Sequence, residues 1–128
     1  MTMIALGAGA LAVPGDAAAA AAGPISAKLV HHVFFTLKNA GSAGDREQLI
    51  AGIRTLGDIP VVRGLHIGVP APTEQRDVID SSYDVSELLL FDSVADQKIY
   101  QDHPVHQAFI AKCGHLWGKV VVYDTLRV

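Results

Sequence analysis

The chain of 128 residues has few of the features that mark disulfide-rich, nucleic-acid-binding or membrane-spanning proteins. Its single cysteine, Cys113, leaves no internal disulfide, and its apolar neighbours predict a small buried side chain rather than a reactive thiol. Ten lysines and arginines against 13 aspartates and glutamates give a net charge of -3, with no basic patch. We therefore expect no nucleic-acid partner. No apolar run is long enough to span a bilayer, so no membrane span is expected.

Motifs for covalent or cofactor chemistry are also missing. The sequence has no Gly-x-Ser-x-Gly elbow, no phosphate-binding glycine loop and no dinucleotide fingerprint. We therefore expect no cofactor. Zinc binding by His103 and His106 is disfavoured, because Asp102 is the one further ligand type near them, and no metal is predicted.

Residues 1–27 differ in composition from the rest of the chain. A short apolar run, residues 4–13, is broken by Pro14-Gly15-Asp16, and residues 17–22 supply the small side chains that a signal peptidase accepts. The usual positive charges before such a run are absent. We interpret the segment as an export-signal-like leader, which predicts a periplasmic or secreted protein. A disordered tail on a cytoplasmic protein is the alternative, and the folded domain is expected over residues 28–128.

The most informative stretch is Tyr100-Gln101-Asp102-His103-Pro104-Val105-His106, with one phenol and two imidazoles. Pro104 has no backbone N–H and fits the first position of a helix, which we expect to run to Cys113. His103 then lies at or beside the N-cap, and His106 lies over the same side of the first turn. The helix dipole lowers the pKa of an imidazole placed there, which suits a general base.

Hydrophobic periodicity predicts strands over 29–37, 61–69, 83–91 and 119–128, a helix over 45–56 and an interrupted helix over 93–113. Between the second and third strands, residues 70–82 form a loop long enough to cover a site or an interface. This order predicts a ferredoxin-like βαββαβ α+β sandwich, with a four-stranded antiparallel sheet and both helices on one face.

The first predicted strand is largely apolar on both faces. Its alternation places His31 with Val33 on one face, and His32 with Phe34 on the other. Whichever face is turned away from the helices exposes apolar side chains on several strands, and such a patch marks an interface. We therefore expect a homodimer formed through the sheet face, with a small-molecule pocket between sheet and helices or inside the dimer.

Four sequence features resemble the stress-responsive A/B barrel (Dabb) domain family. They are the string Tyr-x-x-His-Pro-x-His, a first strand of the form His-x-x-x-x-x-Lys (residues 32–38), Ser82-Tyr83-Asp84 and Tyr123-Asp124. The resemblance covers about residues 28–128 and implies a dimeric ferredoxin-like α/β barrel. It does not imply one activity, because one fold hosts many functions.

Within that family, the string is shared with the olivetolic acid cyclase-type proteins. The resemblance implies that His106 is a catalytic base and that Tyr100 is a catalytic residue that orients the substrate oxygen. A first-strand histidine and a last-strand aspartate of those proteins match His32 and Asp124, which we predict to be substrate-binding, with Asp124 fixing the tautomer of His32. The other predicted substrate-binding residues are His103, for which a capping role is the alternative, and Phe34.

Two functional hypotheses follow. In the first, a small apolar molecule with a carbonyl group binds in the His/Tyr-lined cleft and undergoes cofactor-free acid–base chemistry, such as cyclisation, enolisation or carbon–carbon lyase cleavage. In the second, the protein is a non-catalytic stress-response or binding protein, and its histidines brace the structure. Replacing His106 by alanine separates them: ligand binding is lost in the first case, and the melting temperature falls in the second. Haem degradation ranks lower, because no axial ligand is evident.

Overall fold

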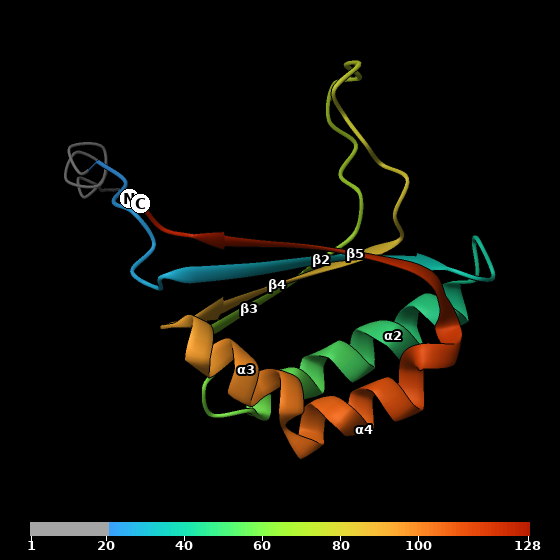
Figure 1. The fold of residues 1–128 in the computed structure, drawn as a ribbon. Coiled ribbons are helices and arrows are strands. Elements are labelled where there is room, and N and C mark those ends of the chain that lie inside the picture. The colour runs from blue at the N-terminus through green and yellow to red at the C-terminus, as the bar shows by residue number, and fades with distance from the viewer. Residues whose placement is uncertain (1–20) are drawn as a thin grey trace, which may run out of the picture.

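Four antiparallel strands form one sheet in the order β3-β4-β2-β5 in the computed structural model, which describes residues 21–128. The strands are β2 (Leu29–Leu37), β3 (Gly64–Gly68), β4 (Val85–Phe91) and β5 (Trp117–Leu126). The helices are α2 (Ala43–Thr55), α3 (Val94–Asp102) and α4 (Pro104–Cys113), with 3-10 turns η2 (Leu56–Asp58) and η3 (Gly114–Leu116). All three α-helices cover the same face of the sheet (Figure 1). The predicted ferredoxin-like α+β sandwich is confirmed.

Side-chain caps start each helix. The Oγ atoms of Ser42 and Ser93 accept hydrogen bonds from backbone N–H groups at the starts of α2 and α3, at 3.1 and 3.0 Å. His103 caps α4, with its Nδ1 accepting from the N–H of Val105 at 3.1 Å, and Pro104 occupies the first turn. These contacts satisfy N–H groups that have no partner inside a helix. The break between α3 and α4 therefore lies where the proline predicted it.

The hydrophobic core lies between the sheet and the helices. Alternate residues of β2 are buried, from Leu29 to Leu37, and they meet Leu49 and Ile53 of α2. Burial of each such side chain contributes about 1.5–3 kcal/mol. Cys113 is 3% exposed, which confirms its predicted burial.

Strand boundaries differ from the prediction in β3, β4 and β5, and β4 begins at Val85 rather than residue 83. β3 begins at Gly64 rather than residue 61, because the N–H of Val62 bonds to the carbonyl of Ile59 at 3.0 Å and keeps the chain in a turn. β5 begins at Trp117, two residues earlier than predicted, and ends at Leu126.

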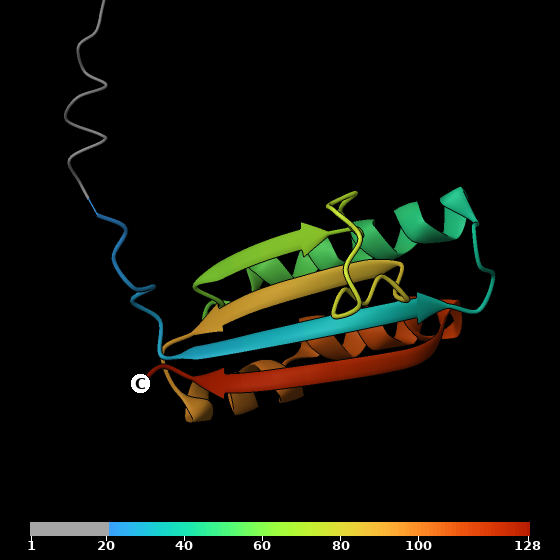
Figure 2. The ribbon, with the colours of Figure 1, turned by 90° about the horizontal axis from the view of Figure 1, so that it is seen from above.

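The segment between β3 and β4 stands away from the sheet on the side opposite the helices (Figures 1 and 2). It contains no regular element, as predicted for residues 70–82, and residues 71–78 are exposed. We call the sheet surface on this side, which carries Phe34, Thr36, Val121 and Tyr123, the open face. No helix covers it.

The predicted export leader, residues 1–27, lies mostly outside the described residues, so export stays a prediction. Within residues 21–128, no helix has the length and apolar character needed to cross a membrane.

Candidate functional site

A cavity of about 140 Å³ lies between the sheet and the two C-terminal helices. We call it the His–Tyr cavity. Its polar lining comes from β2, β4, α3 and α4, and consists of His31, Glu87, Tyr100, Gln101 and His106. The apolar lining consists of Val33, Phe35, Phe109, Ile110, Trp117, Val120 and Val122. Val120, Val122 and Ile110 are about two-fifths exposed, which places the mouth between the edge strand β5 and helix α4.

An imidazole–carboxylate pair joins two neighbouring strands at this cavity. His31 lies directly opposite Asp124 in the β2–β5 register, and the two side chains therefore lie on the same face. His31 Nδ1 is 2.5 Å from Asp124 Oδ1. The imidazole is buried whereas the carboxylate is half-exposed, so Asp124 fixes the orientation of the ring from the solvent side.

The predicted pairing of His32 with Asp124 is wrong. His32 lies opposite Tyr123, on the other face of the sheet, where its ring packs 4.3 Å from that of Phe34. Burial lowers the pKa of His32, and the neighbouring His66 lowers it further. Neither His32 nor Phe34 lines the His–Tyr cavity. His31, to which the sequence analysis gave no role, occupies the expected position.

Tyr100 and His106 lie together at the break between α3 and α4. Their ring centroids are 4.7 Å apart, and the Tyr100 ring also meets His31 edge-on at 5.8 Å. Burial raises the pKa of Tyr100, and the nearby Glu87 raises it further. The phenol therefore stays protonated and can serve as a hydrogen-bond donor to a bound oxygen.

His106 is 7% exposed, and its Nδ1 has no hydrogen-bond partner among the described residues. Burial lowers its pKa, while the Gln101 backbone and the Asp102 carboxylate act in the opposite direction. The imidazole is therefore neutral at neutral pH. Its Nδ1 carries a lone pair, in the tautomer protonated at Nε2, that can accept a proton from a ligand.

Glu87 is a cavity residue that the sequence analysis missed. It is 2% exposed, its Oε2 has no partner within residues 21–128, and burial raises its pKa to about 8. It shares the parity of Val85, Leu89 and Phe91, which are all fully buried. Alternate residues of a strand lie on the same face, so this pattern in the sequence could have indicated that Glu87 faces the core.

His103 does not line the His–Tyr cavity. Its Nδ1 is engaged in capping α4, as described above, which is the alternative that the sequence analysis left open.

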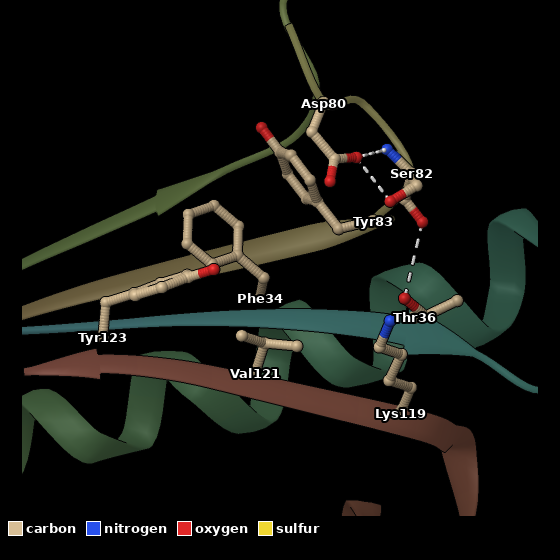
Figure 3. Close-up of a pocket in the computed structure, with 8 residues that line it drawn as sticks. All are labelled: Phe34, Thr36, Asp80, Ser82, Tyr83, Lys119, Val121 and Tyr123. Atoms are coloured by element: carbon tan, nitrogen blue, oxygen red, sulfur yellow. Dashed lines mark hydrogen bonds between the residues drawn. The ribbon is translucent and has the colours of Figure 1, made fainter. Parts of the chain in front are cut away.

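A second hollow, of about 170 Å³, lies on the open face beneath the long loop (Figure 3). Phe34, Tyr83 and Tyr123 form its aromatic wall. Asp80 accepts two hydrogen bonds from Ser82, one from its N–H at 2.9 Å and one from its hydroxyl at 2.5 Å, and these bonds lower the Asp80 pKa. Asp80 and Ser82 are engaged with each other here, whereas Glu87 and His106 of the His–Tyr cavity are buried and each has an unpaired polar atom among the described residues. The His–Tyr cavity is therefore the candidate site.

In the described part of the chain, no group of three or more histidine, cysteine or acidic side chains is placed to hold a metal ion.

The fold and the cavity define a ferredoxin-like α+β protein with a His/Tyr-lined cavity between sheet and helices. Residues 29–126 match the family described as Stress responsive A/B Barrel Domain, or Dabb. The chain belongs to this family, as the sequence resemblance predicted. None of the curated proteins compared with it matches its sequence.

Solved structures share the fold at low sequence identity. A hydroxynitrile lyase from Passiflora edulis has a TM-score of 0.67 at 22% identity, over 81% of this chain and 96% of that one. A Dabb family protein from Mesorhizobium loti has a TM-score of 0.64 at 22% identity, over 80% and 98%. A dimeric ferredoxin-like protein from Thermobifida fusca has a TM-score of 0.65 at 20% identity, over 80% and 92%.

Proposed function

We propose that the protein binds a small, mostly apolar, carbonyl-bearing molecule in the His–Tyr cavity and carries out cofactor-free acid–base chemistry of the lyase type. The observation that supports this most directly is the unpartnered, buried Nδ1 of His106. A histidine that only braced a core would have both ring nitrogens satisfied, because buried polar groups are costly when unpaired. An imidazole nitrogen without a protein partner, in a residue that lines a cavity, is suited to act as a general base.

The proposed reaction cleaves a carbon–carbon bond next to a hydroxyl group. His106 Nδ1 takes the hydroxyl proton, the C–O bond becomes a carbonyl, and the C–C electron pair leaves with the departing group. The proton then passes from His106 to that group or to water, so the protein is regenerated. Tyr100 donates a hydrogen bond to the substrate oxygen, where negative charge develops. The His31–Asp124 pair lies beside Tyr100 and holds the polar end of the cavity rigid.

The size of the cavity limits the substrate. Its volume of about 140 Å³ is close to the roughly 150 Å³ of an engineered cavity that admits benzene. This favours a substrate with a single ring or a short chain over the linear polyketide that ring closure would need. The neighbour from Passiflora edulis, named a hydroxynitrile lyase, is consistent with small-molecule lyase chemistry on this fold.

We also propose that two copies pair through the open face. Tyr123 is 61% exposed there and lies next to Phe34, with ring centroids 6.1 Å apart. Apolar and aromatic side chains at the centre of an uncovered sheet favour association. The neighbour from Thermobifida fusca is described as dimeric, which supports the proposal.

The lyase proposal can be tested with mandelonitrile, an aromatic cyanohydrin whose cleavage releases benzaldehyde and is followed by absorbance. We expect the protein to accelerate benzaldehyde release over buffer, and His106→Ala to lower the rate by about 10²–10⁴-fold, the usual contribution of a general base. Tyr100→Phe should lower it less, because one hydrogen bond is lost and the ring is kept.

His115→Ala is the matched control, because His115 is exposed and does not line the cavity. It should leave the rate unchanged. No acceleration by the unaltered protein, together with a clear drop in melting temperature for His106→Ala, would contradict the proposal and favour a bracing role.

A further inference from the structure

One polar group in the wall of the His–Tyr cavity has no part in the reaction described above. Glu87 lies at the middle of β4, opposite Val33 of β2 and Ile67 of β3, with its side chain on the helix side. It is 2% exposed and its Oε2 accepts and donates no hydrogen bond among residues 21–128. A buried carboxyl group in this condition is unusual in a folded protein.

The surroundings of Glu87 do not favour a carboxylate. Among the described residues that line the cavity, none is lysine or arginine. The titratable groups that share the lining are Tyr100, which stays protonated, together with the imidazoles of His31 and His106. His31 is already engaged with Asp124, and His106 is held neutral by burial. With no lysine or arginine in the lining and His31 paired with Asp124, burial stabilises the uncharged acid.

The second unpartnered group, His106 Nδ1, belongs to the same cavity. Both residues line the cavity from different walls, and no side chain in the described structure satisfies Glu87 Oε2 or His106 Nδ1. A ligand oxygen could accept a hydrogen bond from the Glu87 acid. The hydroxyl group of a bound substrate could donate a hydrogen bond to His106 Nδ1, so that one molecule would satisfy both groups. The cost of burying these two groups is then offset when the ligand binds.

We propose that Glu87 is a substrate-binding residue that donates a hydrogen bond, as an uncharged carboxylic acid, to the oxygen of the bound molecule, and that it makes the cavity selective for neutral carbonyl and hydroxyl compounds over carboxylates. This inference rests on the proposed function, because it assigns the ligand to the same cavity. It adds that the ligand is neutral rather than negatively charged. Burial raises the pKa of Glu87 to about 8, so the acid is the main form at pH 6.5. A carboxylate ligand would enter without a counter-charge and next to a second acid.

Three probes of nearly equal shape test the inference by binding at pH 6.5, without turnover. Benzaldehyde has a neutral acceptor, styrene replaces that oxygen by carbon, and benzoate carries a negative charge. We expect the protein to bind benzaldehyde about tenfold more tightly than styrene, the ratio that one buried hydrogen bond supplies, and more than tenfold more tightly than benzoate.

Two substitutions at Glu87 separate hydrogen bonding from space filling. Glu87→Gln keeps an uncharged donor and should hold benzaldehyde affinity within about threefold, whereas Glu87→Leu removes the donor and should lower it about tenfold, to the level of styrene. Ser86→Ala is the matched control, because Ser86 is buried on the same strand but faces the opposite side. Melting curves establish that each variant is folded.

The outcomes distinguish this inference from the proposed function. Equal binding of benzaldehyde and styrene, or an unchanged benzaldehyde affinity in a folded Glu87→Leu variant, would overturn the role of Glu87 and leave the role of His106 intact. Failure of all three probes to bind would show that the cavity takes no ligand of this class, and would overturn both. Preferred binding of benzoate would overturn the charge selectivity.

Discussion

Glu87 gives the stability of this fold an unusual dependence on pH. The ordinary pKa of 4.5 applies in the unfolded chain, and burial raises the folded value to about 8. Below about pH 4.5 the acid is protonated in both states. Between these two values only the unfolded chain loses its proton, so the free energy of unfolding falls as the pH rises. Well above pH 8 Glu87 is ionised in both states, and the total decrease in the free energy of unfolding reaches about 5 kcal/mol.

Glu87→Leu should therefore raise the free energy of unfolding by several kcal/mol at pH 8 and by much less at pH 5. Urea unfolding of the variant and of the unaltered protein at the two pH values measures these free energies. Because both proteins contain His106, whose lowered pKa has the opposite effect on stability, its contribution cancels when one free energy is subtracted from the other at each pH. A constant difference across this range would mean that Glu87 is ionised in the folded protein.

Individual side chains in this site show how far alternation along a strand can be used. Alternation along the sequence correctly placed His31 and His32 on opposite faces of the sheet. Which of the two pairs with Asp124 depended on the residue that lies opposite Asp124 in the neighbouring strand. That register is set by pairing between β2 and β5, 93 residues apart at His31 and Asp124, and no local pattern encodes it. Tyr100 and His106 needed no such register, because Pro104 positions both through local helix geometry.

At the scale of elements, helices α2 and α4 approach each other closely at Gly52. A Cβ atom at this position would lie 2.5 Å from Cys113 Sγ and 3.1 Å from the Phe109 ring. Gly52→Ala should gain about 1 kcal/mol from helix propensity and lose about 1–3 kcal/mol from overpacking, so we expect a net loss of stability by urea unfolding.

Gly44→Ala is the control in the same helix, because a Cβ atom there meets nothing within 4 Å, and it should be neutral or stabilising. Adding Cys113→Ala to Gly52→Ala removes the clashing sulfur and should recover part of the loss. A stabilised Gly52→Ala variant would show that the two helices can separate at little cost.

Elements whose ends are marked by local chemistry could be predicted well. β2 and α4 have the predicted bounds, since a β-branched and aromatic run defines the first and Pro104 starts the second. β3 is shorter than predicted because a turn that ends at Val62 competes with the sheet, and valines alone do not reveal that competition.

At the scale of the whole molecule, the open face should control the oligomeric state. Tyr123→Glu places a charge at the centre of the proposed interface, and the side chain is exposed enough in one copy that folding should tolerate it. We expect the unaltered protein to have the mass of two chains by light scattering, and the variant to have the mass of one.

Ile99→Glu is the control, because Ile99 is 52% exposed on α3, on the side of the helices. It should leave the dimer intact. Dimers that persist in Tyr123→Glu, and dissociate in Ile99→Glu, would place the interface on the helical side instead.

The overall architecture was predictable because element order and the apolar character of both sheet faces are properties of the entire sequence. The volume of the cavity was not, because it depends on how far α3 and α4 lie from the edge strand β5. That spacing arises from packing of large side chains such as Phe109 and Trp117, whose rings lie 5.6 Å apart.

The two ends of the folded domain meet beside the first and last strands. The N–H of Arg127 bonds to the carbonyl of Lys28 at 2.7 Å, and Leu29 lies opposite Leu126. One short peptide bridge would therefore close the backbone into a ring, and the exposed stretch 71–78 offers a place to reopen it. A circularly permuted gene built this way would keep every strand pairing and every cavity residue. It would also turn the long loop into two free tails, which separates any role of that loop from the chemistry proposed for the His–Tyr cavity.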